Sequence, residues 1–244
     1  MKSGNILILF LLSTYHLMSQ SLLDSFNTSV YIWSKDFRAI SNSELSALLI
    51  KHKVQQAFIS DDEDSLLKHK KQLLCRGLKN TNIRVVHLIG YNQWLRLSDR
   101  NLQKCINRLP HGRFHIDIEP HTMPDWPENK IYYQHKYLKI LNLLHAKGEV
   151  TAAIPFHFNQ DFIKEIYKKT SLCYIMVYGK ANMEAWHSRL ADELRVSRGQ
   201  MSFCFNVNDY SSSSEMEYTI NKFRNQYNCT TIAIHAFMDW AKLQ

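Results

Sequence analysis

Short runs of branched and aromatic residues recur along the chain at regular intervals, and this recurrence limits the fold more than any other feature. Successive runs start 22 to 37 residues apart. Each interval has room for a strand, a helix and two loops, so every run is predicted to be a strand. The eight runs occupy residues 30–34, 54–60, 83–90, 113–119, 150–156, 172–178, 201–207 and 230–235.

The segments between the runs have the apolar spacing of amphipathic helices. One helix is expected after Ser41, and another before Gly148, which is expected to stop it. The serine run 211–214 precedes a third helical pattern and is interpreted as a loop with an N-cap rather than a linker. The apolar positions that carry these patterns include Leu45, Leu48, Leu49, Tyr137, Ile140, Leu141, Leu144, Met216, Ile220 and Phe223.

Alternation of strands and helices favours a parallel sheet covered by helices. Eight such units predict a single (β/α)8 TIM barrel, with an open doubly wound sheet as the alternative. No GxGxxG or GxxxxGK[ST] motif follows the first run, which argues against the open sheet. The sequence shows no domain boundary and no internal repeat.

The first residues have the pattern of a secretory signal peptide. Lys2 gives a positive start, residues 6–12 are unbroken apolar sequence, and small polar residues follow at 19–21. We therefore expect residues 1–20 to be a signal peptide and residues 21–244 to form the barrel domain. This predicts a secreted or periplasmic protein that touches a membrane only through an uncleaved signal segment.

The chain is basic, with 30 Lys+Arg against 22 Asp+Glu and a formal charge of +8. Its densest basic run, residues 68–71, lies inside an amphipathic pattern and is interpreted as a solvated helix face. No aromatic residues interleave with it, so a nucleic-acid partner is not expected. Five cysteines without a CxxC pair do not predict structural zinc, and no cofactor is expected. Disulfide pairing and oligomeric state are left open.

The fourth run departs from the apolar character of a buried parallel strand. Phe114, Ile116 and Ile118 alternate on one face, which places His115, Asp117 and Glu119 on the opposite face, inside the barrel. Buried ionisable groups are costly, and barrel enzymes place their chemistry at the carboxyl ends of the strands. Two carboxylates about 7 Å apart along a strand raise the pKa of one of them. Glu119 is therefore predicted as a general acid and Asp117 as the group that orients it or shares its proton. The alternative is a structural carboxylate pair bonded to backbone or to Arg113.

Aromatic and polar residues also end other runs, and their recurrence at the same end predicts a carbohydrate pocket. Aromatic faces pack on sugar rings, while amides and carboxylates bond hydroxyl groups. The expected substrate contacts, besides His115 and the hydroxyl donor Tyr178, are Trp33, Trp94, His157, Asn206, His235 and Trp240. A metal site could draw its ligands from His115, Asp117, His121, His157 and His235, but the sequence has no tight motif such as HExxH, so no metal is predicted. The sequence has no GxSxG elbow, so a serine hydrolase is not predicted.

Several motifs resemble those of known barrels. HIDIEPH at 115–121, followed by PDW at 124–126, resembles a group of largely uncharacterised bacterial barrel proteins described as glycoside hydrolase-like. GYNQW at 90–94, IPFHF at 154–158, IMVY at 175–178 and AIH at 233–235 match in the same order. The Asp-x-Glu and Met-x-Tyr patterns are also similar to family 18 glycoside hydrolases of the chitinase type. That resemblance implies that Glu119 is the acid, that Asp117 positions the N-acetyl group of the substrate, and that Tyr178 bonds the same region.

The chain departs from the chitinase-type pattern at two places and from that of other retaining barrel hydrolases at a third. Residues 109–113 lack the further acidic residues of the chitinase strand, and Gly179 stands where an Asp follows the Met-x-Tyr. Asn206 stands near the position of the nucleophilic Glu of other retaining barrel hydrolases, so substrate-assisted hydrolysis fits better. Asp209 is the candidate base for an inverting reaction. The predicted function is cleavage of a polysaccharide or glycan. The alternatives are a non-catalytic carbohydrate-binding or accessory barrel and a different, metal-assisted barrel enzyme.

Overall fold

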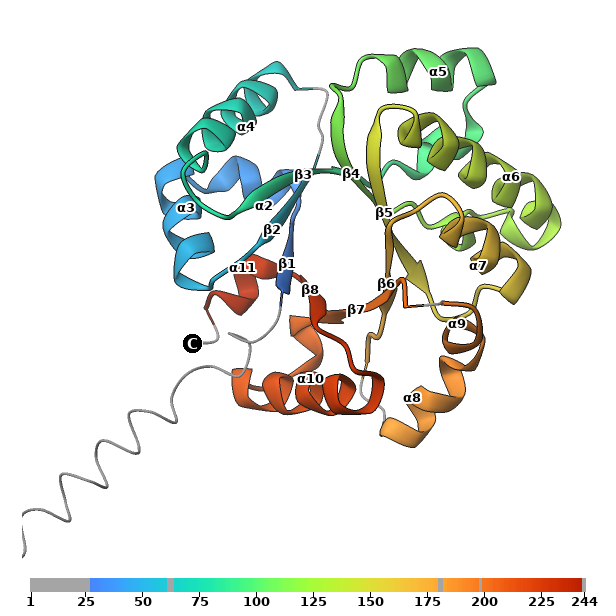
Figure 1. Cartoon of the computed structure of the whole chain (residues 1–244). Coiled ribbons are helices and arrows are strands. Elements are labelled where there is room, and N and C mark those ends of the chain that lie inside the picture. Colours follow the sequence, from blue (N-terminus) through green and yellow to red (C-terminus); the bar gives the residue numbers. More distant parts are fainter. Residues whose placement is uncertain (1–26, 61–63, 180–181, 198, 243–244) are drawn as a thin grey trace, which may run out of the picture.

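Eight parallel strands close into one barrel in the computed structural model, which describes residues 27–60, 64–179, 182–197 and 199–242. Each strand pairs with the next along the chain, and β8 returns to pair with β1 (Figure 1). This is the predicted (β/α)8 barrel. The strands are β1 (Asn27–Ile32), β2 (Gln56–Ser60), β3 (Arg84–Ile89), β4 (Gly112–Ile116), β5 (Gly148–Pro155), β6 (Leu172–Met176), β7 (Met201–Asn206) and β8 (Thr231–His235).

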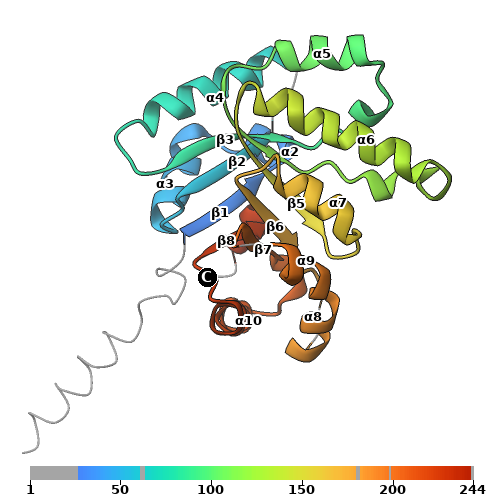
Figure 2. The ribbon, with the colours of Figure 1, turned by 45° about the vertical axis from the view of Figure 1, so that its right-hand side comes forward.

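The helices form a ring outside the strands, as Figures 1 and 2 show. Ser41 and Ser212 accept hydrogen bonds from the backbone N–H groups of Glu44 and Glu215, which confirms both as N-caps. The α-helices are α2 (Ser34–Ala39), α3 (Asn42–Lys51), α4 (Ser65–Gly77), α5 (Asp99–Asn107), α6 (Trp126–His145), α7 (Gln160–Tyr167), α8 (Met183–Arg189), α9 (Ala191–Val196), α10 (Ser213–Tyr227) and α11 (Phe237–Trp240). Short 3₁₀ turns η2 (Asn92–Arg96), η3 (Pro120–Thr122) and η4 (Val207–Asp209) follow β3, β4 and β7.

The strands separate two apolar cores, because successive side chains of a strand point to opposite faces. Phe114, Ile116 and Ile118 belong to the larger core between strands and helices, as their alternation predicted. The smaller core fills the barrel and includes Tyr31 and Tyr174. The odd-numbered residues of the fourth run therefore enter the barrel.

Gly148 does not act as the predicted helix stop. The helix α6 already ends at His145, and Gly148 is the first residue of β5. It pairs with Gly112 of β4, and a Cβ added to Gly148 would lie 1.7 Å from the carbonyl oxygen of Gly112. The residue is thus required by the close approach of two strands.

The basic run 68–71 is not the uniformly solvated face that its sequence predicted. The Lys70 ammonium donates to the carbonyl oxygens of Phe37, at 2.6 Å, and Ile40. Lys71 is buried and donates to the carbonyl of Ile59 at 3.0 Å. Backbone carbonyl groups therefore bind two of these cations: those at the end of α2 bind Lys70, and one of β2 binds Lys71.

The predicted signal peptide, residues 1–20, lies outside the described residues. No helix in the described ranges is both long and apolar enough to cross a bilayer. All five cysteines are free thiols, of which Cys75 is exposed and Cys173, Cys204 and Cys229 are buried.

Glu193 of α9 is a fully buried carboxylic acid whose two side-chain oxygens have no hydrogen-bond partner among the described residues. Burial raises its pKa from 4.5 to about 7. The folded protein therefore holds this proton more tightly than the unfolded chain, and stability falls as the pH rises from about 4.5 to about 7.

We expect Glu193→Met to stabilise the protein by about 1–3 kcal/mol at about pH 8, because an apolar side chain of similar size removes the buried charge. The gain should be smaller at about pH 4, where the wild-type group is protonated in both states. Urea unfolding at the two pH values measures this, with the exposed Glu128→Met as the control. An equal gain at both values would contradict the assignment.

Candidate functional site

Asp117 is the first residue beyond β4 and marks where the chain leaves the barrel. Its N–H still bonds the carbonyl of Ile89 at 2.9 Å, so the residue keeps the register of the sheet. The residue as a whole is half-buried, but its Oδ1 is buried without a hydrogen-bond partner among the described residues. An acceptor in this state is unusual in a folded protein and is available to a ligand.

Glu119 is half-buried and is held by a closed cycle of hydrogen bonds from two loops. Its N–H donates to Asn92 Oδ1 at 2.8 Å, and its carbonyl accepts from Thr122 Oγ1 at 2.8 Å. Asn92 Nδ2 in turn donates to Thr122 Oγ1 at 2.9 Å. The cycle fixes the backbone of Glu119 without occupying its carboxyl group.

The two carboxyl groups have raised pKa values, as their spacing predicted, but repulsion is the smaller cause. Burial raises the pKa of Asp117 to about 7, and the nearby Glu119 adds to the shift. Burial also raises the pKa of Glu119. The pair therefore keeps one proton up to about pH 7, which is the state a general acid needs.

Three aromatic side chains meet at the same end of the barrel. The Trp33 Nε1–H donates to Nε2 of His235 at 3.1 Å, and the rings of His235 and Tyr178 lie 5.6 Å apart. Because Nε2 accepts, the neutral His235 ring carries its proton on Nδ1, which is buried without a described partner. Burial, with Cys204 and Asp117 nearby, raises the pKa of Tyr178 well above its ordinary value, so its hydroxyl stays a donor.

His115 lies one layer deeper in the barrel and is fully buried. Its ring stacks on Phe58 with centroids 4.0 Å apart, and its nitrogens lie 2.6 Å from Tyr31 Oη and 2.8 Å from Thr151 Oγ1. Burial lowers its pKa to about 3, so the imidazole is neutral. Aromatic residues from other strands cover His115, so the side chain predicted as a substrate contact is buried below the mouth of the barrel.

We expect Tyr31→Phe to destabilise the protein by about 1–3 kcal/mol, because it leaves a buried nitrogen of His115 without its partner. Chemical denaturation measures the change. The exposed Tyr132→Phe is the matched control and should change stability by less than about 0.5 kcal/mol. Equal effects of the two substitutions would show that the Tyr31–His115 bond carries little of the stability of the barrel.

Two other residues predicted as substrate contacts have side chains that belong to the outer core. Trp94 is 6% exposed in η2, where it packs beside Tyr91. Trp240 is 2% exposed in α11, and its ring lies 4.6 Å from that of His52 beyond the end of α3. Both residues follow barrel strands in sequence, yet neither faces the barrel opening.

His157 and Asn206 follow their strands as expected but make local contacts. The exposed His157 ring lies 4.4 Å from that of His121, and no described contact joins it to Asp117 or Glu119. Asn206 pairs with His235 across β7 and β8, and its side chain accepts from the N–H of Asn208.

Three residues outside the predicted acid, orienting and substrate-binding set also belong to the site: Asn92, Thr122 and Asp209, the last of which the sequence offers as the base of an inverting reaction. Asn92 and Thr122 position Glu119, as described above. Asp209 accepts from the N–H of Gly179 at 2.6 Å, which brings a carboxylate beside the residue that follows Tyr178. Asn92 and Asp209 lie in loops after strands, where the position of a side chain depends on a partner far away in the sequence.

Among the described residues, no three His, Cys, Asp or Glu side chains are grouped as metal ligands would be. We name the cluster of Asp117, Glu119, Tyr178, Trp33 and His235 the mouth site. It combines two carboxyl groups with raised pKa values, a phenol and an indole ring at the carboxyl ends of β1, β4, β6 and β8.

Comparison with known proteins adds the fold but no family. No protein-family model matches the chain, and no curated protein matches it. A Toxoplasma gondii protein provisionally described as a deoxyribose-phosphate aldolase is 10% identical, with a TM-score of 0.60, over 94% of this chain and 95% of that one. An endo-β-N-acetylglucosaminidase from Cordyceps militaris is 14% identical, with a TM-score of 0.54, over 89% and 85%.

A third solved structure has the same fold. The tryptophan synthase α-subunit from Pyrococcus furiosus is 11% identical, with a TM-score of 0.54, over 88% of each chain. Proteins with such different names share this barrel, and identities this low show the fold alone. The chain is thus similar to TIM-barrel enzymes of several kinds, while the resemblance to glycoside hydrolases stays a prediction from its motifs.

Proposed function

We propose that this barrel is a glycoside hydrolase that cleaves an N-acetylated polysaccharide or glycan, with Glu119 as general acid. The observation that carries the proposal is the pair of half-buried carboxyl groups, Asp117 and Glu119, at the carboxyl end of β4, where burial raises the pKa of both, that of Asp117 to about 7. Hydrolysis of a glycosidic bond needs a carboxylic acid that still holds its proton near neutral pH.

The mouth site suggests a division of roles in which each group has one task. Glu119 gives its proton to the glycosidic oxygen as the bond to the anomeric carbon breaks. The acetamido oxygen of the substrate attacks that carbon, and Asp117 and the Tyr178 hydroxyl bond the acetamido group and hold it in line. Water then attacks the anomeric carbon and opens the cyclic intermediate, while Glu119 accepts a proton from that water.

Within the described ranges, β7 carries no second carboxylate at the end where a retaining hydrolase would use one. Asn206 ends β7, and its side-chain oxygen bonds backbone rather than facing Glu119. Asp209, the first acidic residue after Asn206 in the sequence, accepts a hydrogen bond from the N–H of Gly179. Attack by the acetamido group of the substrate removes the need for a protein nucleophile.

The similar solved structures are compatible with this proposal and do not decide it. One of them is an endo-β-N-acetylglucosaminidase, whose name gives an N-acetylated glycan as substrate. Another is provisionally an aldolase. Aldol chemistry through a Schiff base needs a lysine amine, and none of the eight described strands contains lysine.

We further propose that the protein works outside the cytoplasm, because residues 1–20 have the pattern of a signal peptide. Intact-mass measurement of protein recovered from the exported fraction tests this. A mass that lacks about 20 N-terminal residues supports export, and full-length protein found only in the cytoplasm contradicts it.

Incubation with N-acetylglucosamine oligosaccharides and with their deacetylated counterparts tests the function. Cleavage of the acetylated chains alone is expected, and a thiazoline analogue of the cyclic intermediate should inhibit it. Binding of the acetylated chains without any cleavage would replace the proposal with a non-catalytic carbohydrate-binding barrel. Equal cleavage of both sets would contradict the role of the acetamido group.

A further inference from the structure

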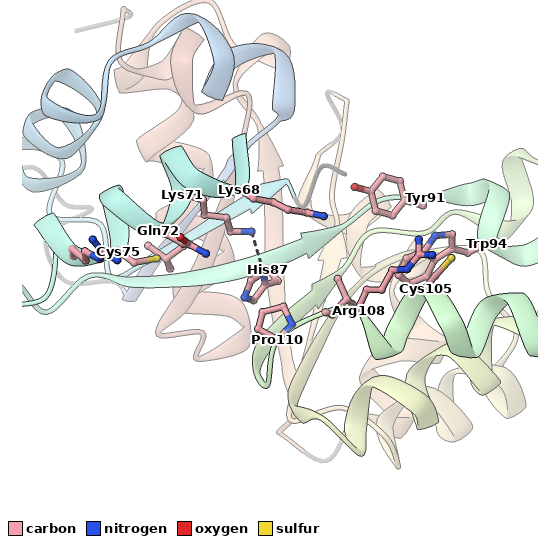
Figure 3. Close-up of a pocket in the computed structure, with 13 residues that line it drawn as sticks. Lys68, Lys71, Gln72, Cys75, His87, Tyr91, Trp94, Cys105, Arg108 and Pro110 are labelled. Atoms are coloured by element: carbon pink, nitrogen blue, oxygen red, sulfur yellow. Dashed lines mark hydrogen bonds between the residues drawn. The ribbon is translucent and has the colours of Figure 1, made fainter. Parts of the chain in front are cut away.

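A cavity of about 710 Å³ lies between α4 and α5, over the outer face of β3 (Figure 3). We call it the α4–α5 cavity. Its size falls within the roughly 300–1,000 Å³ of small-molecule sites. Val85, Leu109 and Pro110 and the rings of Tyr91 and Trp94 give it an apolar part.

The cavity does not open into the barrel. Val85 and His87 of β3 line it, whereas Val86 and Leu88 of the same strand belong to the inner core. Alternating residues of the strand thus face two separate spaces. A ligand in the α4–α5 cavity would leave the mouth site free, so the inference does not rest on the proposed function.

The wall formed by α4 is a basic stripe with helical spacing. Lys71, Gln72, Cys75 and Arg76 lie three, four, seven and eight residues after Lys68, which places all five on one face of the helix. Arg108, at the end of α5, extends from the opposite wall in Figure 3. None of the thirteen residues that line the cavity is acidic.

Three of these cations are not neutralised by the described part of the chain. Lys68, Arg76 and Arg108 make no ion pair there. Other surface cations do: Arg96 pairs with Asp125 at 2.7 Å, and Lys136 pairs with Asp99 at 2.7 Å. The uncompensated positive charge is thus gathered around a cavity that also offers aromatic surface.

We propose that the α4–α5 cavity binds a small molecule in which an apolar ring carries an anionic group, namely a carboxylate, sulfate or phosphate. The ring would lie against Trp94 and Leu109, where it removes apolar surface from water. The anionic group would bind to the unpaired cations of the lining, of which Arg76 and Arg108 carry guanidinium groups that bind such oxygens with two parallel hydrogen bonds.

Fluorescence titration with anilinonaphthalene sulfonate tests the proposal, because this probe joins a sulfonate to fused rings. The neutral phenylnaphthylamine has the same rings without the sulfonate. We expect the folded wild-type protein to bind the anionic probe at least about tenfold more tightly. Equal affinity for the two probes would overturn the proposal.

A pair of double variants locates the binding. Arg76→Gln with Arg108→Gln should weaken binding of the anionic probe by about tenfold or more and leave the neutral probe unchanged. The control, Lys79→Gln with Lys104→Gln, removes the same charge from exposed residues near the same helices but outside the cavity lining. An equal loss of affinity for the anionic probe in both double variants would show that general surface charge causes the effect, and it would overturn the proposed site.

Two thiols give a second readout that does not depend on fluorescence. Cys75 and Cys105 line the cavity and are accessible, whereas the other three cysteines are buried. The anionic probe should slow alkylation of Cys75 and Cys105 by iodoacetamide in the wild type and in the control variant, as peptide mapping would show. Unchanged alkylation rates at saturating probe would place the ligand elsewhere and contradict the proposal.

Discussion

Glu119→Gln is expected to lower glycan cleavage by about 100- to 10,000-fold while the protein keeps its fold. The amide has nearly the shape of the carboxylic acid but has no proton to give to the leaving oxygen. Its position is unchanged because Asn92 and Thr122 bond the backbone of residue 119 and not its side chain. Substrate binding should therefore survive, and the loss should appear in kcat.

The matched control is Glu128→Gln, which makes the same change at an exposed position in the first turn of α6 and should leave activity within about twofold. A melting temperature of Glu119→Gln far below that of the wild type would show that Glu119 is structural. Activity retained by Glu119→Gln would assign the acid role to another residue, first to Asp117, whose pKa is about 7.

The same pair predicts the pH dependence of the wild-type enzyme. The acid must be protonated, so kcat/KM should fall as the pH rises past about 7, where the pair loses its last proton. In Asp117→Asn the neighbouring carboxyl can no longer share its proton with Glu119, and the alkaline limb should move to lower pH. A pH–rate profile of the two proteins measures the shift.

The largest expected loss of stability comes from adding one methyl group, in Gly148→Ala. The new Cβ would lie 1.7 Å from the carbonyl oxygen of Gly112, and this obstacle is backbone, so no side chain can turn away. The pairing of β4 with β5 must open at this point, which we expect to cost at least about 3–5 kcal/mol or to prevent folding. The φ angle of Gly148 is not positive, so the steric contact alone carries the prediction.

Gly112→Ala is the matched control, because it adds the same methyl group to the partner residue in the same ladder. Its Cβ would meet only the ring of His87, at 3.8 Å, and stability should change by less than about 1 kcal/mol. Soluble yield and guanidinium unfolding of the two variants decide the matter. Similar stability of both would contradict the close approach of the strands at Gly148.

The sequence predicted the barrel because its strands and helices have different and regular apolar periods. The period of two also placed Phe114 and Ile116 outside the barrel and Asp117 inside it, as found. The extent of the fourth strand was predicted too long, since β4 ends at Ile116. Pro120, which has no N–H for a ladder, starts a 3₁₀ turn soon after it.

The predicted site residues that lie away from the mouth site show what a single sequence does not contain. Trp94 and Trp240 come soon after strands, but each lies in a helical turn, so the period of two that orients strand residues no longer applies. His115 does point inward, as predicted, and is closed off by Tyr31, Phe58 and Tyr174 from three other strands. Depth within a barrel depends on neighbours that no pattern within one strand reveals.

The return of β8 to β1 limits how this molecule meets other chains. Every described strand has a neighbour on both sides, so its backbone N–H and C=O groups are already committed within the sheet. An extended peptide therefore finds no lateral edge in the described chain at which to add itself as a ninth strand, the route by which many open sheets recruit partners or aggregate. Recognition through the strands of this barrel must therefore use their side chains, because the strand amides and carbonyls are already paired.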